Sequence, residues 1–185
     1  MSTQILTIAP AGTWSLDPVH SSVGFEVPYL AGTFKGEFHE IGAGLTVEDE
    51  RASLEGSAKV ASVDVKDENL AAHLQSPDFF DAERYPELRF SAAEISLDGD
   101  GNVSVGGELT IKGVTKPVTV TGTVTAPIAD AWGNDRVGLN LTATVDRTDF
   151  GVSWNNPLPS GDPSLANDVT ILADLQFVKA GGGSN

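Results

Sequence analysis

The chain contains no cysteine among its 185 residues. This absence excludes disulfide bonds, thiolate metal ligands and a cysteine nucleophile. Positive charge is also scarce, since 11 lysine and arginine residues stand against 26 acidic ones and give a formal net charge of −15. Nucleic-acid binding needs clusters of lysine and arginine, and anionic membranes repel acidic proteins. We therefore expect neither as a partner.

Long hydrophobic runs are missing too. No window approaches the roughly 18 apolar residues of a membrane-spanning helix, so we expect no stable membrane insertion. Residues 1–10 lack the basic start and the apolar stretch of a secretory signal, which predicts a cytoplasmic protein. Length and a hydrophobic content of 40% fit one domain with its own core. We expect that domain over residues 12–180, between an N-terminal tail (1–11) and a flexible glycine-rich tail (181–185).

Alternation of apolar and polar residues is the main pattern in the sequence, and it predicts eight β-strands. The strands are expected at residues 23–29, 34–47, 54–65, 88–97, 103–111, 118–124, 137–145 and 169–177. The second of them is expected to contain a glycine-rich bend at Gly42 and Gly44. Two of them change phase by one residue, near Ala61 and between Ala92 and Ile95, as at a β-bulge. Short connections at residues 98–101 and 112–117 predict antiparallel neighbours.

One segment, residues 66–75, has a helical pattern. Asp67 and Glu68 lie in its first turn, where they complement the helix dipole, and Leu70 and Leu74 share a face. A Ser-Pro step ends the helix. The residues that follow have no strand pattern, and we expect them to form a lid loop between the third and fourth strands.

Eight long antiparallel strands lose their exposed edges if they close into a barrel. A barrel of this size is either filled by side chains or holds one small ligand. Small residues on the apolar faces favour a hollow interior, although glycines can also relieve bends in a barrel wall. These small residues are Gly36, Gly56, Ala58, Gly107, Gly122, Ala143 and Ala173. The fold class that we predict is an all-β, eight-stranded antiparallel barrel with one short helix.

Motifs for metals, cofactors and catalysis are absent from the sequence. The three histidines have no metal-binding spacing. The segment that starts at Asp98 begins like a calcium loop, but Val103 and Leu109 stand where such a loop needs glycine and glutamate. No Gly-x-Ser-x-Gly elbow occurs. We therefore expect no metal and no cofactor.

Aromatic residues are the main candidates for ligand binding. Phe79 and Phe80 are adjacent in the lid loop and cannot point the same way. One of them is expected to anchor the loop, and the other to meet a ligand or the barrel wall. The full candidate set is Phe25, Tyr29, Phe34, Phe38, His73, Phe79, Phe80, Phe90, Trp132 and Trp154.

Four motifs, in this order, resemble the YceI family of lipocalin-like polyisoprenoid-binding proteins over about residues 12–180. They are Thr13-Trp14-x-Leu16-Asp17-x-x-His20-Ser21-x-Val23-x-Phe25-x-Val27, the segment from His73 to Asp81 with Tyr85-Pro86, the segment from Leu109 to Val118, and the segment from Asp146 to Asn155. The resemblance implies a lipocalin-like barrel whose pore holds a long isoprenoid chain, such as an isoprenoid quinone or a polyprenyl pyrophosphate. It also implies a role in transport or stress response, without a catalytic mechanism, and many family members are periplasmic.

Two departures from the family pattern concern the expected pocket mouth. Pro28-Tyr29 stands where the family often has histidine, and Leu70-Ala71 stands where it often has an Arg-Asp pair. Both changes remove polar or charged groups, so the family's preference for a head group cannot be carried over to this chain.

Our first hypothesis is a non-catalytic carrier for an isoprenoid or a similar long-chain amphipathic lipid, with a homodimer as one arrangement. Two alternatives stay open. One is an enzyme that acts on a small lipophilic substrate inside the barrel, with Tyr29 and His73 as its acid and base. The other is a barrel that serves only as an interaction module, with a solid core and an exposed apolar patch.

Overall fold

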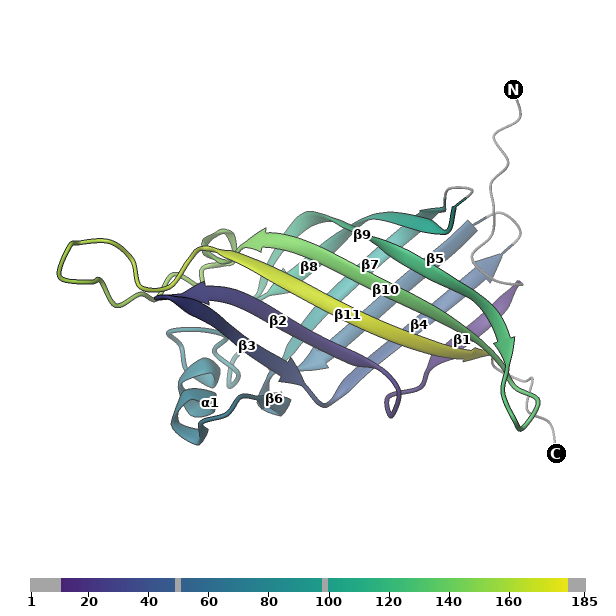
Figure 1. The fold of residues 1–185 in the computed structure, drawn as a ribbon, viewed down its shortest axis with the longest axis horizontal. Coiled ribbons are helices and arrows are strands. Elements are labelled where there is room, and N and C mark those ends of the chain that lie inside the picture. Colours follow the sequence, from purple (N-terminus) through teal and green to yellow (C-terminus); the bar gives the residue numbers. More distant parts are fainter. Residues whose placement is uncertain (1–10, 49–50, 98–99, 180–185) are drawn as a thin grey trace, which may run out of the picture.

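A closed barrel of eight antiparallel strands forms the body of the protein, in the order β1-β4-β5-β7-β8-β9-β10-β11, with β11 pairing back to β1 (Figure 1). The computed structural model describes residues 11–48, 51–97 and 100–179. The strands are β1 (Gly12–Leu16), β4 (Ile41–Glu48), β5 (Arg51–Lys59), β7 (Glu87–Leu97), β8 (Asn102–Ile111), β9 (Val114–Ala129), β10 (Asp135–Asp146) and β11 (Asp168–Lys179). The predicted eight-stranded antiparallel barrel is confirmed.

Strand β11 carries two different neighbours along one edge. Near its end it pairs with β1, where Leu16 lies opposite Phe177, and nearer its start it pairs with β2 (Ser22–Tyr29), where Phe25 lies opposite Ile171. Strand β2 forms a hairpin with β3 (Gly32–Phe38), and β6 (Val63–Asp64) adds a short pairing to β3. This branch widens the wall at one end of the barrel.

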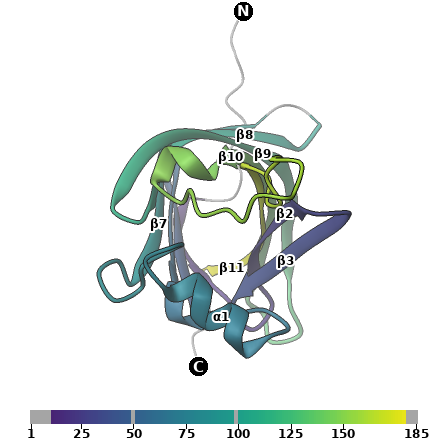
Figure 2. The ribbon, with the colours of Figure 1, turned by 90° about the vertical axis from the view of Figure 1, so that its left-hand side faces the viewer.

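Helix α1 (Glu68–Gln75) covers that wider end, between β7 and the β2–β3 hairpin (Figure 2). Asp67 caps the helix, and its carboxylate accepts hydrogen bonds from the backbone N–H groups of Asn69 (2.8 Å) and Leu70 (3.1 Å). Leu74 is the buried residue of the helix. The predicted helix is confirmed, with Asp67 as its cap rather than part of its first turn.

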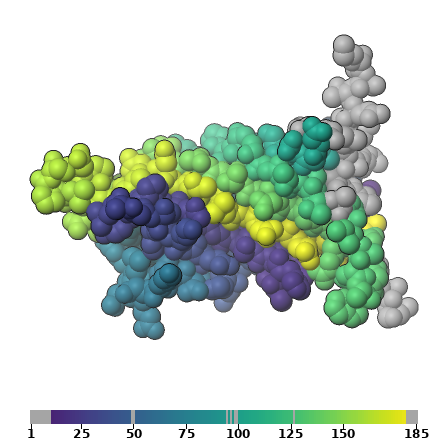
Figure 3. All heavy atoms as spheres, viewed as in Figure 1, coloured from purple at the N-terminus to yellow at the C-terminus, as the bar shows by residue number. Residues whose placement is uncertain are grey.

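The two ends of the barrel differ in how they are filled. At the end that β1 closes, which we call the closed end, Trp14 and Phe177 have no exposed surface. The opposite end, which carries α1 and the loop 151–167, is called the mouth. A separate buried cluster lies there, and it includes Phe38 and Phe150. In the space-filling view, the loop projects beyond the strands at the mouth (Figure 3).

The structure corrects several predicted strands. Strand β1 was not expected, and the predicted strand 34–47 is two strands that turn at His39 and Glu40. Gly42 and Gly44 lie inside β4 rather than at a bend. The phase change near Ala61 is not a bulge, because residues Val60–Ser62 form the short 3-10 helix η1.

Other local predictions hold. The register between β7 and β8 shifts between Ser91 and Glu94, so the bulge expected there is confirmed. The β8–β9 connection is tight and antiparallel as predicted, but it is a two-residue turn rather than residues 112–117, because β9 already begins at Val114. Lys112 and Gly113 both have positive φ (52° and 75°), as such a turn requires. Part of the turn at 98–101, and both predicted tails except residue 11, lie outside the described residues.

Candidate functional site

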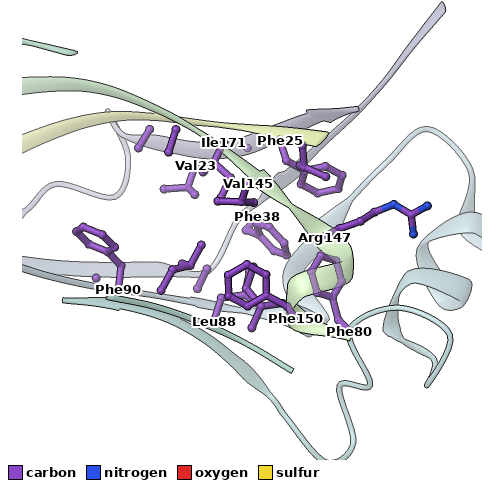
Figure 4. Close-up of a pocket in the computed structure, with 18 of the residues that line it drawn as sticks. Val23, Phe25, Phe38, Phe80, Leu88, Phe90, Val145, Arg147, Phe150 and Ile171 are labelled. Atoms are coloured by element: carbon purple, nitrogen blue, oxygen red, sulfur yellow. The ribbon is translucent and has the colours of Figure 1, made fainter. Parts of the chain in front are cut away.

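A cavity of about 370 Å³ lies inside the barrel on the mouth side (Figure 4). This volume is within the range of about 300–1,000 Å³ that is typical of small-molecule sites. Its wall is built from inward-facing residues of many strands, and on β11 these are Val169, Ile171, Ala173 and Leu175. The next inward residue, Phe177, belongs to the closed end. The cavity therefore occupies one half of the barrel.

Nine of the ten predicted site residues line this cavity. They are Phe25, Tyr29, Phe34, Phe38, His73, Phe79, Phe80, Phe90 and Trp154. Trp132 does not line it. Its side chain is 81% exposed in the turn between β9 and β10, where its backbone N–H donates to Asp130 Oδ1 (2.8 Å). We therefore remove Trp132 from the candidate site.

The small residues that suggested a hollow interior have three different roles. Gly56, Ala58, Ala143 and Ala173 line the cavity and leave room in it. Gly36 and Gly107 instead lie beneath aromatic rings, because an added Cβ would be 2.5 Å from Phe25 Cζ at the first and 2.7 Å from Phe90 Cζ at the second. Gly122 allows a close approach to the backbone of Asn140 on β10. The first group alone supports the argument for a cavity.

Phe79 and Phe80 point to different parts of the mouth. Phe79 is buried, and its ring centroid lies 5.3 Å from that of Trp154 on the loop 151–167. Phe80 is half-buried and contacts the barrel wall, with ring centroids 5.8 Å from Phe38 and 6.3 Å from Phe25. Phe79 is thus placed as an anchor, and Phe80 as part of the cavity wall.

His73 and Lys112 connect the segments that border the mouth. The His73 ring meets both Phe79 and Trp154 edge-on, each with a centroid distance of 4.9 Å, and its Nε2 lies 2.9 Å from Asp78 Oδ2. Lys112 Nζ donates to the backbone carbonyl of Pro77 (2.6 Å), and to that of Gly151 at 3.3 Å. The lid loop and the loop 151–167 are therefore held together by contacts on both elements.

Arg147 organises the loop 151–167, and sequence reasoning missed it although it lies inside a quoted motif. It begins the short 3-10 helix η2 (Arg147–Phe150), and its side chain is buried. Its guanidinium donates to four backbone carbonyls, those of Val152, Trp154, Leu165 and Ala166, at 2.8–3.4 Å. Burial lowers the pKa of this guanidinium, and the charge of Asp146 opposes that shift. The head of the side chain points away from the other labelled residues of the cavity (Figure 4).

Three of the cavity-lining residues can carry positive charge, and each already has an acceptor. They are His73, Arg89 and Arg147. The Arg89 side chain is largely exposed, and its guanidinium bonds to Glu87 Oε2 (3.0 Å). His73 pairs with Asp78, and Arg147 is engaged by carbonyls. The described lining thus offers an apolar chain a large contact surface but offers an anionic group no unengaged cation.

The other chemical alternatives receive little support from the geometry. Tyr29 and His73 both line the cavity, but within the described residues no hydrogen bond joins them. In the same part of the chain, no three histidine, aspartate or glutamate side chains are grouped so that they could hold a metal ion. A solid core, which the interaction-module alternative needs, is not present at the mouth.

None of the helices in the described ranges is both long enough and apolar enough to cross a membrane.

Fold and cavity together define a closed antiparallel β-barrel with an apolar internal cavity. The sequence matches the family model for the YceI-like domain over residues 14–177, and the chain belongs to that family. A UPF0312 protein of Pseudomonas putida strain W619 is 33% identical over 141 residues, which cover 72% of this chain and 71% of the relative. A UPF0312 protein of Pseudomonas syringae pv. tomato is 32% identical over 160 residues, which cover 82% and 80% of the two chains.

Solved structures show the same architecture. BcnA of Burkholderia cenocepacia has a TM-score of 0.76 at 25% identity, over 87% of this chain and 98% of BcnA. A polyisoprenoid-binding domain from Saccharophagus degradans, implicated in plant cell wall breakdown, has a TM-score of 0.69 at 13% identity. That match covers 90% of this chain and 98% of the domain, and at this identity it shows the fold alone.

Proposed function

We propose that this protein is a non-catalytic carrier that holds an isoprenoid or a similar long-chain amphipathic lipid in its barrel, with the tail inside and the head at the mouth. The observation that carries the proposal is the apolar cavity, which is enclosed by strands and bordered at the mouth by aromatic rings. Membership of the family supports it, as does the fold shared with a polyisoprenoid-binding domain.

Burial of the tail supplies enough free energy for useful affinity. Each CH₂ group moved from water to an apolar site contributes about 0.8 kcal/mol, so a five-carbon isoprene unit contributes roughly 4 kcal/mol before ordering costs. Micromolar binding requires about 8 kcal/mol. A tail of about three units therefore suffices, once part of the gain is lost to ordering.

The charges near the cavity favour an uncharged head group. The cationic lining residues are already bonded to acceptors, and the chain as a whole carries a formal charge of −15. A diphosphate at the mouth would meet this negative field without an unengaged cation among the described lining residues to offset it. An alcohol or a quinone would avoid this cost.

The most direct test fills the cavity with a single side chain. Gly56 lines the cavity, and an added Cβ there would have Gly42 O (3.8 Å) and Ala43 Cβ (3.9 Å) as its nearest neighbours, so the Cβ of a larger residue meets only ordinary van der Waals contacts. We expect Gly56→Leu to weaken binding of the isoprenoid alcohol geranylgeraniol at least about ten-fold in isothermal titration calorimetry, a loss of about 1.4 kcal/mol.

Gly106→Leu is the matched control. Gly106 lies on β8, is exposed and has equally open space around its added Cβ, so this leucine lies outside the barrel and should leave the affinity unchanged. Equal affinity of wild type and Gly56→Leu would contradict the proposal. A cytoplasmic location, a homodimer and a role in transport or stress response stay predictions for cell fractionation, light scattering and deletion strains.

A further inference from the structure

We infer that the cavity is a tube closed at its inner end, and that Phe90 sets the longest ligand tail that it accepts. This inference rests on the proposed function and adds a selectivity for chain length. Three observations carry it: the point at which the cavity lining stops on each strand, the packing beyond that point, and the position of the Phe90 ring.

The lining stops at one layer of the barrel. On β5, the innermost lining residue among the apolar positions is Leu54, and the next inward residue, Ala52, is buried in the closed end. On β10, Leu141 lines the cavity and Leu139 does not. On β11 the lining likewise ends at Leu175. The lining therefore ends at a similar depth on several strands, and we call this inner end the floor of the cavity.

Beyond the floor the barrel is solid. Trp14, Leu45 and Val105 have no exposed surface, and Val47 and Val137 are each 1% exposed. Side chains packed in this way leave no space for an alkyl chain, because protein interiors have the density of organic crystals. A ligand tail that reaches the floor has no way through to the other end.

Phe90 stands at this floor. Its neighbours across the sheet are Gly56 on β5 and Leu109 on β8, and its ring lies over Gly107, where an added Cβ would be 2.7–2.8 Å from the ring. The side chain is half-buried, whereas Ala92, the next inward residue of β7, is 5% exposed. Figure 4 shows Phe90 at the opposite end of the cavity from Phe80.

The geometry explains why Phe90 in particular controls depth. A large ring is supported by one glycine and flanked by another, so its removal opens space that no neighbouring side chain fills. The inward residues from Val169 to Leu175 are six residue steps apart along β11, or about 20 Å of strand. A tail longer than this wall must leave its end in the mouth or fold back.

The test compares ligands with tails of graded length on wild type and on Phe90→Ala. Geraniol, farnesol, geranylgeraniol and longer isoprenoid alcohols are titrated calorimetrically into wild type and Phe90→Ala. In wild type, affinity should rise about ten-fold or more with each isoprene unit and then stop rising when the tail meets the floor. In Phe90→Ala, this limit should move at least one unit longer.

Phe80→Ala is the matched control, because it removes a phenylalanine that lines the same cavity at the mouth. It should weaken binding of all tails without moving the limit. Phe90→Leu keeps an apolar side chain over Gly107, so the fold should tolerate this substitution better than Phe90→Ala. It should move the tail-length limit in the same direction by a smaller amount.

Three outcomes would overturn the inference. An affinity that keeps rising with tail length in wild type would show that the tube is open. An unchanged limit in both Phe90 variants would show that another residue forms the floor. If wild type binds none of the alcohols, the proposed function fails first and the length selectivity falls with it.

Discussion

The closed end and the mouth are built from the same strands, yet they solve the packing problem in opposite ways. At the closed end, large side chains such as Trp14 and Phe177 meet in the barrel centre and fill it. At the mouth, small residues such as Ala143 and Ala173 face inward, and the aromatic rings border a cavity instead of filling it. One barrel thus places its stability mainly at one end and its binding surface at the other.

The two ends also use a partly or fully buried arginine differently. At the closed end, Arg136 joins two turns through carboxylates, with Nη1 2.7 Å from Asp17 Oδ2 and Nε 2.8 Å from Asp130 Oδ2. At the mouth, Arg147 bonds to backbone carbonyls in a single long loop. The carboxylate partners of Arg136 titrate, whereas the backbone carbonyls that Arg147 contacts do not.

The largest expected effect is a difference in unfolding free energy between a substitution at the closed end and one at the mouth. Trp14→Ala should lower the free energy of unfolding by about 3–5 kcal/mol, because it leaves a cavity in a packed core. Phe80→Ala should cost roughly 1 kcal/mol, because its half-buried ring already borders empty space. Urea unfolding of both variants measures the difference, and equal losses would contradict the division into a solid and a hollow end.

The second effect concerns the loop at the mouth. Arg147→Met should destabilise the protein by about 3 kcal/mol, because buried carbonyls lose a charged donor. Hydrogen exchange should speed up in residues 151–167 and stay unchanged in β1. Arg147→Lys, which keeps the charge but not the planar fork of donors, should be intermediate. Unchanged exchange in the loop would show that Arg147 does not organise it.

The smallest effect is the pH dependence of the closed end. Hydrogen bonds from Arg136 hold the pKa of Asp17 well below its usual range and lower that of Asp130 to about 2. A depressed carboxyl pKa stabilises the fold above the unfolded value of about 4, and this stability is lost as pH falls through the folded value. Arg136→Gln should therefore raise the pH midpoint of acid unfolding, and an unchanged midpoint would contradict the assignment.

Much of the barrel follows from local sequence because its signals are local. Strict alternation in residues 137–145 and 169–177 gives both the strands and their inward faces. Gly113 supplies one of the two positive φ angles that the β8–β9 turn needs. The aromatic residues of β2 and β3 also line the cavity as predicted, because inward parity alone brings them together.

Prediction from the sequence failed for residues whose position or role depends on contacts with distant parts of the chain. Trp132 resembles the other aromatic candidates in composition, but which end of the barrel it occupies is set by the β9–β10 connection, not by its neighbours. Arg147 carries no local sign that its partners are carbonyls up to 19 residues away. Gly42 suggested a bend, yet in β4 it fits the regular pairing with Ser57.

Native mass spectrometry of the purified protein tests most directly whether the hollow end holds a lipid. We predict that wild type carries a non-covalent apolar ligand, or acquires geranylgeraniol on incubation, and releases it into organic solvent. Gly56→Leu should carry much less, and Gly106→Leu as much as wild type. A wild-type protein that shows only its bare mass, yields no extractable lipid and takes up no added isoprenoid alcohol would contradict the account.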